Sequence, residues 1–358
     1  MNIEFNKSMK SKIYVTTALV LMAILLARPE KGNAQKIRAG IIAFYNLENL
    51  FDTLDTPGVL DTEFTPDGPK HWTSEKYWTK INNLGRVIAR IGSHENINGP
   101  AILGVSEVEN RTVLEDLVHS EHLKNLNYQI VHYDSPDERG VDVALLYQPR
   151  YFKITNARNV PLFLLREDGE RDYTRDQLVV SGLFDGDPMH IIVNHWPSRY
   201  GGQKASAPLR IEAAKLTRSL VDSIRTIHPN DKIVIMGDLN DDPIDKSVKK
   251  YLNTEGKQQK IKDDQLYNPM ETLYKKGIGS LAYQGKWNLF DQIIITPNML
   301  EEQDGYRLNA ARIFNDAFLL RDAGRYKKYP HRTFVGNDFQ GGYSDHLPVY
   351  IIVVKNIR

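Results

Sequence analysis

The chain contains no cysteine among its 358 residues. This absence excludes disulfide bonds, zinc–thiolate sites and a thiol nucleophile. It also excludes a lipid anchor attached through cysteine. Any metal site or catalytic centre in this chain must therefore be built without a cysteine sulfur.

The chain also lacks an excess of charge of either sign. It has 46 basic and 45 acidic residues, and without its first 34 residues it has 41 basic and 43 acidic ones, a net charge of about −2. A protein that holds nucleic acid on a broad basic surface should be strongly positive. A polyanionic substrate would therefore have to be attracted by local arginines and a bound cation.

Outside the N-terminus we find no long apolar run and no apolar or aromatic hairpin suited to entering a bilayer. The run Ile13–Ala27 follows Lys7, Lys10 and Lys12 and precedes the small residues around Ala34. This pattern predicts a signal peptide over residues 1–34 that directs export to the periplasm, the outer surface or the medium. A retained anchor is the alternative, but about 15 residues are fewer than the roughly 20 needed to span a bilayer. An exported protein without disulfides is more typical of bacteria than of animals.

Residues 35–358 are predicted to form one domain, since no low-complexity linker or internal repeat divides them. Short apolar runs bounded by turn signals predict nine strands. Helical spacing is present at 75–91, 113–119 and 209–227, with a short helix at 247–252. Many strands with few helices predict an α/β fold, a four-layered sandwich of two packed mixed sheets flanked by helices. The predicted strands are 38–46, 101–106, 128–132, 141–147, 178–184, 190–195, 232–237, 289–296 and 349–354.

Polar residues follow several of these predicted strands directly. Asp238 and Asn240 come two positions apart after an apolar strand, so their side chains point to one side and could bind a cation and a phosphate oxygen. Asp345 and His346 precede the last strand and combine a carboxylate with a group that moves protons near neutral pH. Each segment alone could equally be an ordinary acidic turn or surface turn.

Four further segments follow the same pattern. His195 ends an apolar strand before a proline turn, although a structural histidine is an equal reading there. Asp291 precedes three isoleucines, where burial of an acid requires a partner. Glu107 lies just beyond another strand, and spacing alone leaves the choice between it and Glu109 open. Asn46 and Glu48 follow the apolar run Ile41–Phe44 of the first strand.

Taken together, these residues resemble the endonuclease/exonuclease/phosphatase superfamily, because their order along the chain also matches. In that family an Asn, a Glu, a His or Tyr, an Asp-x-Asn, an Asp and an Asp-His follow one another, and all are present here. His195 in place of a tyrosine is similar to the pancreatic-deoxyribonuclease branch. The matching positions are Asn46, Glu107, His195, Asp238 with Asn240, Asp291, and Asp345 with His346.

The resemblance implies hydrolysis of a phosphodiester by in-line attack of activated water, without a covalent intermediate. It implies an Mg²⁺ or Mn²⁺ ion held by Asn46, Glu107 and Asp345, since oxygen ligands suit these ions. In this branch Arg175 resembles a phosphate-contacting arginine, and Arg175, Asn240 and Asp142 are assigned to substrate binding.

The resemblance also implies proton-transfer roles. We expect His346, oriented by Asp291, to be the general base, with Asp238 as the rival base. His195, oriented by Asp142, is expected to act as general acid or phosphate clamp.

The family resemblance also gives expectations about the substrate. A monomeric nuclease acting on DNA or RNA is the first expectation, by analogy with the family. A sphingomyelinase-like lipid phosphodiesterase and a phosphatase acting on sugar or inositol phosphates are the alternatives. A non-catalytic binding protein with this fold should have lost metal or histidine positions, and this chain keeps them.

Overall fold

The structure is a computed structural model that describes residues 36–95, 97, 99–166, 168–301 and 305–357. Residues Arg38–Lys355 form one compact unit. The predicted signal peptide, residues 1–34, lies outside the described residues. Among the residues described, no helix is both long and apolar enough to span a membrane.

Two large mixed sheets make up the centre of the unit. In spatial order the first sheet has the strands β16 (Arg307–Ile313), β19 (Val349–Ile357), β1 (Lys36–Leu50), β2 (Ile102–Val108), β4 (Asp142–Tyr147) and β3 (Gln129–His132). The second has β11 (Thr254–Glu255), β12 (Leu266–Tyr267), β15 (Asp291–Ile295), β10 (Lys232–Asp238), β9 (Asp187–His195), β8 (Gln177–Phe184) and β5 (Phe152–Val160). Three small hairpins are β6–β7 (Leu164–Leu165 and Arg171–Asp172), β13–β14 (Leu281–Tyr283 and Lys286–Asn288) and β17–β18 (Phe334–Val335 and Asp338–Phe339).

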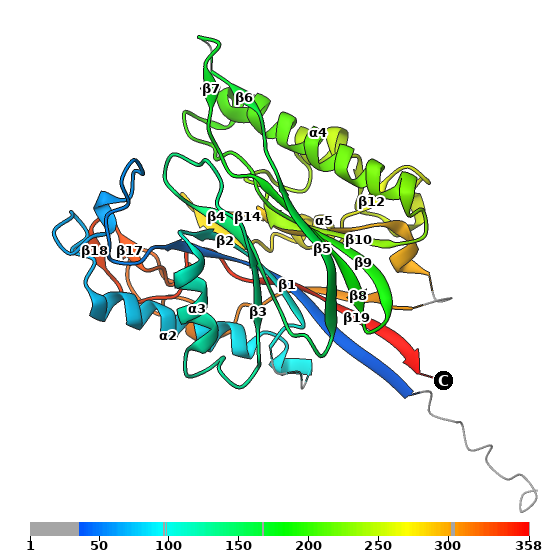
Figure 1. The fold of residues 1–358 in the computed structure, drawn as a ribbon, viewed down its shortest axis with the longest axis horizontal. Helices are drawn as coiled ribbons and strands as arrows, with labels where there is room; N and C mark the ends of the chain where they lie inside the picture. The colour runs from blue at the N-terminus through cyan, green and yellow to red at the C-terminus, as the bar shows by residue number, and fades with distance from the viewer. Residues whose placement is uncertain (1–35, 96, 98, 167, 302–304, 358) are drawn as a thin grey trace, which may run out of the picture. The chain divides into compact units, whose positions relative to one another are not determined.

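Helices cover the outer faces of both sheets, so the predicted four-layered sandwich is confirmed. The helices are α2 (Ser74–Arg90), α3 (Arg111–His119), α4 (Gln203–Ile227) and the short α5 (Met270–Lys275). Figure 1 shows α4 on one side of the sheets and α2 and α3 on the other. Short helical turns lie at Thr62–Phe64, Ser93–Glu95, Ser247–Tyr251, Gln258–Lys260, Pro297–Leu300 and Ala317–Leu319.

The alternation of side chains along the strands divides the core into layers. On β1, Ile41, Ala43 and Tyr45 pack on the side of α2, whereas Ile42 and Phe44 join the core between the two sheets. This follows from the period of two of an extended chain. Asn46 is the next residue on the same face as Ile42 and Phe44, so it places a polar side chain between the two sheets. The same change from apolar to polar occurs on β9, β10 and β15, and it creates the site described below.

Two sheet edges were not predicted from the sequence. Strands β5 and β16 lie at the edges of their sheets, and most of their residues are half-buried or exposed. Strands of this kind lack the continuous apolar run that marks a buried strand. All nine predicted strands and the predicted helices are present, and α4 begins at Gln203, six residues before the predicted start.

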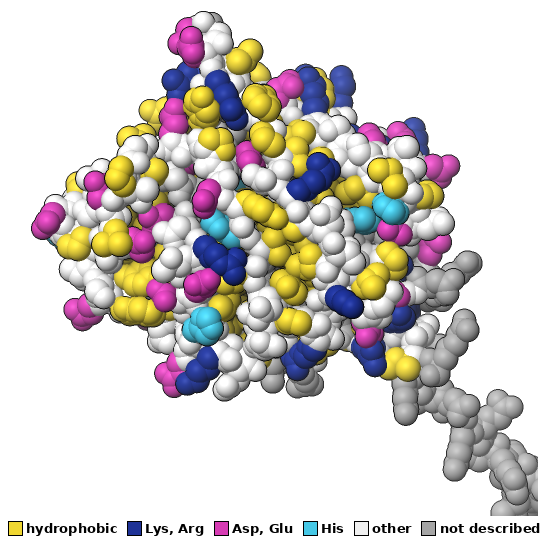
Figure 2. All heavy atoms as spheres, in the orientation of Figure 1, with side chains coloured by type: hydrophobic (Ala, Val, Ile, Leu, Met, Phe, Trp, Pro, Cys, Tyr) yellow, Lys and Arg dark blue, Asp and Glu magenta, His cyan; other side chains and the backbone are white. Residues whose placement is uncertain are grey.

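A hairpin with exposed aromatic residues was also missed. In the β6–β7 hairpin, at the top of the view in Figure 1, Phe163 and Leu165 are each 68% exposed. The guanidinium of Arg171 lies over the rings of Phe163 and Tyr173, at 4.3 and 4.6 Å from their centroids. The tip itself carries Asp168 and Glu170. On the face shown in Figure 2, basic and acidic side chains are intermixed.

The contact between β10 and β9 leaves no room for a side chain at Gly237. A Cβ there would lie 2.3 Å from the backbone oxygen of Asn194, whereas at Gly104 the nearest atom is the flexible Met236 Sδ at 2.5 Å. We expect Gly237→Ala to lower the free energy of unfolding by about 1–3 kcal/mol in urea titrations. Gly104→Ala should cost less, because a thioether can move more easily than a paired backbone, and equal losses would contradict this account.

Candidate active site

Three polar side chains meet at one end of the second sheet because of strand register. Asp238 ends β10 and pairs with His195 on the parallel strand β9 and with Asp291 on the antiparallel strand β15. Residues that pair across neighbouring strands point to the same face. The row Val234, Met236, Asp238 therefore leads from the core between the sheets directly to a buried carboxylate.

The first sheet contributes Asn46 and Glu107 to the same place. Asn46 Nδ2 donates to Asp238 Oδ2 at 3.0 Å and to Glu107 Oε1 at 3.3 Å. His195 Nε2 lies 3.8 Å from Glu107 Oε1 and 3.9 Å from Asp238 Oδ2. The structure thus brings together Asn46, Glu107, Asp238 and His195 from four strands of two sheets.

Irregular backbone positions these groups. The pairing of β1 with β2 and of β2 with β4 shifts register at Asn46–Leu50 and at Ser106–Val108, and Glu107 lies in the second shift. Glu48, Asn49, Glu107 and Asn240 have φ of 51°, 52°, 59° and 50°. Such left-handed conformations are uncommon for residues other than glycine and gather at functional sites, as β-bulges do.

The bulge decides between Glu107 and Glu109. Glu107 Oε2 accepts a hydrogen bond from the Asn49 backbone at 2.9 Å, beside Asn46 and His195. Glu109 accepts from the Asp52 backbone at 2.6 Å and from Thr56 Oγ1 at 3.3 Å. Only Glu107 of the two contacts the residues gathered around Asp238.

His346 forms a buried pair with Asp291. Its Nδ1 lies 2.6 Å from Asp291 Oδ2, which also accepts a hydrogen bond from Ser280 Oγ, and its Nε2 lies 3.8 Å from Asp238 Oδ2. Burial lowers the pKa of His346, but the charge of Asp291 and its hydrogen bond outweigh burial, so the pKa stands well above the ordinary value. This shift favours the protonated, imidazolium form of His346.

Asp238 and His195 are shifted toward their neutral forms. Burial, together with the charge of Asp291, raises the pKa of Asp238 to about 7, although the cation of His346 opposes this. Burial and the nearby charges of Arg175 and Arg139 hold the pKa of His195 well below its usual value. The site thus contains two histidines that favour opposite forms: His346 the charged form and His195 the neutral form. Asp238, close to both, has a pKa of about 7.

The predicted substrate-binding residues Arg175 and Asn240 converge on one backbone oxygen. Arg175 donates to Trp196 O at 2.9 Å and to Asp137 Oδ2 at 2.9 Å. Asn240 Nδ2 donates to Trp196 O at 3.0 Å, and its backbone N–H to Asp238 Oδ1 at 2.9 Å. Arg139, half-exposed and close enough to affect His195, was not predicted, because it lies in a loop with no recognisable motif.

Asp142 contacts a different histidine from the expected one. It accepts hydrogen bonds from the backbone and hydroxyl of Ser135 and pairs with His132 Nε2 at 2.9 Å. Within the described part of the chain, His195 Nδ1 has no hydrogen-bond partner. The expected orientation of His195 by Asp142 is therefore wrong in this structure, since β4 begins at Asp142 and directs its carboxylate toward β3.

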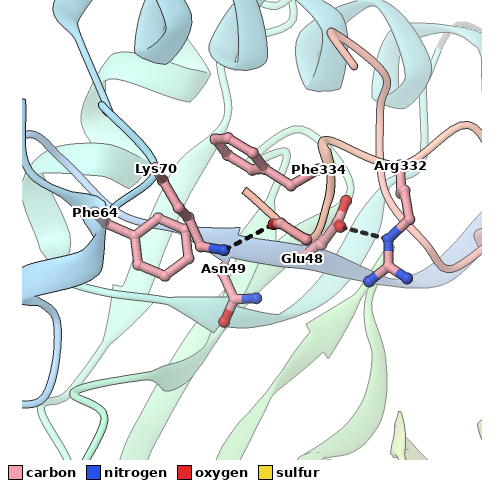
Figure 3. Close-up of a pocket in the computed structure, with 7 residues that line it drawn as sticks. Glu48, Asn49, Phe64, Lys70, Arg332 and Phe334 are labelled. Carbon is pink, nitrogen blue, oxygen red and sulfur yellow. Dashed lines mark hydrogen bonds and ion pairs between the residues drawn. The ribbon is translucent and has the colours of Figure 1, made fainter. Parts of the chain in front are cut away.

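Asp345 is paired with an arginine that the sequence did not single out. Arg332 donates to Asp345 Oδ2 at 2.8 Å and to Glu48 Oε1 at 3.2 Å. Figure 3 shows the Glu48 carboxylate facing Arg332 in a pocket beside the site, with Lys70 on its other side. Lys80 of α2 lies fully buried nearby and donates to Thr333 Oγ1. Burial lowers its pKa to about 8, against the opposing charge of Glu48.

The donor set around Glu107 fits a hard divalent cation. Glu107 offers a carboxylate that is partly open to solvent, and the Asn46 amide lies beside it with Nδ2 toward the carboxylate. Asn46 Oδ1 accepts from the Glu48 backbone N–H at 2.9 Å, so the amide would have to rotate to offer its oxygen to a cation. Oxygen donors with room for retained waters are what Mg²⁺ prefers. Asp345 would have to leave Arg332 to join them. Asp238, Asp291 and His346 also place ligand atoms within 4.8 Å of one another, but His346 Nδ1 is already bound to Asp291.

Glu109 provides a pH-dependent test of the local structure. Burial raises its pKa from 4.5 to about 7 despite its hydrogen bonds. The folded state therefore takes up a proton between these values, and this contribution to stability is lost as pH rises through about 7. Glu109→Gln, which stays neutral and can still accept from Asp52, should raise Tm at pH 8 but not at pH 5. Glu115→Gln, at an exposed position of α3, is the control. Equal shifts of Tm at both pH values in Glu109→Gln would contradict the assignment.

Comparisons with known proteins agree with this fold. A family model described as "Endonuclease/Exonuclease/phosphatase family" matches residues 41–355. No curated protein sequence matches the chain.

Three solved structures show the extent of the likeness. An endonuclease/exonuclease/phosphatase family protein from Bacteroides thetaiotaomicron has 16% identity and a TM-score of 0.53, over 90% of this chain and 97% of that one. D. rerio TDP2 complexed with a single strand DNA product has 13% identity and a TM-score of 0.52, over 88% and 98%. The Bacteroides thetaiotaomicron mannosyl-6-phosphatase has 18% identity and a TM-score of 0.50, over 88% and 99%. At these identities the likeness shows the fold alone.

Proposed function

The chain belongs to the endonuclease/exonuclease/phosphatase family, and from this premise we propose that it is an exported, Mg²⁺- or Mn²⁺-dependent phosphodiesterase that cleaves nucleic acid. One observation carries the proposal. The Asn46 amide and the Glu107 carboxylate lie directly beside Asp238, with Asn46 Nδ2 3.3 Å from Glu107 Oε1 and 3.0 Å from Asp238 Oδ2. The Nε2 atoms of His195 and His346 lie 3.9 and 3.8 Å from Asp238 Oδ2. A phosphodiester placed there would contact a cation, a proton acceptor and a proton donor at once.

The pKa shifts favour Asp238 over His346 as the proton acceptor. His346 is protonated by its pair with Asp291, so it would hold or protonate a phosphoryl oxygen. Asp238, with a pKa near neutrality, would orient the attacking water and take its proton. Asn240, Arg175 and neutral His195 surround the place where the phosphoryl oxygens would lie. A metal ion held by Asn46 and Glu107 would neutralise charge that builds on those oxygens.

The surroundings of the site favour nucleic acid over lipid. A lipid phosphodiesterase should present an apolar element to the bilayer. The β6–β7 hairpin is exposed, but Asp168 and Glu170 at its tip and Arg171 over its aromatic rings oppose insertion. The TDP2 neighbour bound to single strand DNA product supports a nucleic acid strand, and the mannosyl-6-phosphatase neighbour makes a sugar phosphatase the second candidate.

Export and a monomeric state complete the proposal. Export is supported by the basic and apolar segments within residues 1–34. The net charge of about −2 for the remainder means that attraction of a polyanion would depend on the bound cation and on arginines near the site.

We expect His346→Ala to lower kcat on a phosphodiester by at least about 10²-fold, the usual contribution of a general acid–base group. The matched control is His190→Ala, because His190 is also a buried histidine paired with a carboxylate, with Nε2 3.0 Å from Asp231 Oδ2. His190 lies at the opposite end of β9. Both variants remove a buried imidazole, so we expect similar losses of Tm. The loss of activity should be confined to His346→Ala. Near-normal hydrolysis by folded His346→Ala would contradict the assignment.

Removal of divalent metal should abolish hydrolysis, and Mg²⁺ or Mn²⁺ should restore it, because the donor set consists of oxygens. The substrates for this assay are duplex DNA, single-stranded DNA, RNA, sphingomyelin, and simple phosphate mono- and diesters. A profile limited to monoesters would overturn the phosphodiesterase proposal in favour of the sugar phosphatase. No hydrolysis of any substrate would favour a binding protein.

A further inference from the structure

A second cavity opens next to the site, between the tip of the β13–β14 hairpin and the segment 321–336. Its volume is about 460 Å³, within the usual range for a small-molecule site. Its wall includes Arg332 and Asp345, the ion pair that borders the catalytic groups. A substrate with its phosphodiester at Asp238 could therefore extend into this cavity. Its other lining residues used below are Tyr283, Arg321, Arg325, Tyr326 and Tyr329.

Two tyrosines of this cavity form an aromatic platform, and a third, Tyr283, has the most exposed ring. The rings of Tyr326 and Tyr329 are 5.9 Å apart, and Tyr329 lies 6.3 Å from Trp287. The Tyr329 hydroxyl accepts a hydrogen bond from the Gly285 backbone at 2.6 Å, which ties the platform to the hairpin. Tyr283, at the end of β13, is 65% exposed. Any nucleic acid base can stack on such an open aromatic face, whatever its identity, because every base has a flat π-face.

Two of the three arginines that line the cavity lack acidic partners. Arg332 is neutralised by Glu48 and Asp345, but among the described residues neither Arg321 nor Arg325 forms an ion pair. Arg321 donates to Gln340 Oε1 at 2.9 Å, and Arg325 lies over the ring of Tyr326 at 5.6 Å. Two uncompensated guanidinium groups in one cavity favour an anion, because guanidinium binds phosphate with two parallel hydrogen bonds.

We propose that this cavity binds the nucleotide unit next to the scissile phosphate, with the base stacked on Tyr283 and the flanking phosphate held by Arg321 and Arg325. The inference rests on the proposed nuclease function and adds the subsite that would recognise the nucleic acid strand. A sugar monophosphate has a single phosphate, which the catalytic site already engages, so it would leave these two arginines without a partner. A nucleic acid strand supplies both a ring and a second phosphate.

The test compares a single-stranded oligodeoxynucleotide with methyl p-nitrophenyl phosphate, a diester too small to reach the cavity. Tyr283→Ala and Arg325→Ala should each raise KM for the oligonucleotide about tenfold, the effect of losing one stacked base or phosphate contact. Both should leave kcat/KM for the small diester unchanged. Tyr283→Phe, which keeps the aromatic face, should restore the oligonucleotide KM. Arg111→Ala, on the outer face of α3, is the control for loss of a positive charge.

The outcomes distinguish failure of the cavity assignment from failure of the proposed phosphodiesterase function. Equal effects on both substrates, or none on the oligonucleotide, would overturn the cavity assignment while hydrolysis of the small diester upholds phosphodiesterase activity. If the wild-type protein hydrolyses neither diester, binding of the labelled oligonucleotide is measured by fluorescence anisotropy. Weaker binding by Arg325→Ala than by Arg111→Ala would then support the cavity although the proposed function fails, and equal or absent binding would overturn it.

Discussion

The hydrogen bond from Asn46 Nδ2 to Asp238 Oδ2 joins the two sheets at the centre of the site. Both side chains are buried, at 0% and 2% exposure, so neither can rely on water for its partner. The remaining groups of the site contact these two side chains. Glu107 also accepts a hydrogen bond from the Asn46 amide, Asn240 donates its backbone N–H to Asp238, and His346 faces the Asp238 carboxylate. The geometry of the site therefore depends on how the two sheets pack.

The same packing explains why the two histidines of the site differ in charge. Both are buried, and burial alone would make both neutral. His346 has the carboxylate of Asp291 in direct contact, and that charge outweighs burial, whereas His195 has the cations Arg175 and Arg139 nearby. Near Asp238, His346 would therefore offer a phosphate an acid, and neutral His195 would offer a weaker polar contact.

Much of this arrangement could be predicted from the sequence, because it depends on local periodicity. Apolar runs marked the strands that are buried on both faces, and a polar residue at the end of each run marked the edge where they converge. Asp238 was found in this way, whereas the prediction of His195 and Asp291 depended more on the family resemblance. The edge strands β5 and β16 were not, since a half-exposed strand has no continuous apolar signal.

The rest depends on contacts that no local pattern encodes. Spacing could not choose between Glu107 and Glu109, because the choice is made by a bulge in β2. Asp142 was assigned to the wrong histidine, since its partner depends on the pairing of β3 with β4. Arg139 and Arg332 lie in loops, and only the tertiary fold brings them close to the site.

The most direct test of this account is the dependence of the phosphodiester hydrolysis rate on Mn²⁺ concentration in Glu107→Gln and Glu109→Gln. The two glutamates lie two residues apart, and only Glu107 contacts Asn46 and His195. We expect Glu109→Gln to reach half-maximal rate at the wild-type Mn²⁺ concentration, and Glu107→Gln to require a much higher concentration. The same Mn²⁺ dependence in both variants would contradict the placement of the metal at Glu107 and with it the proposed site.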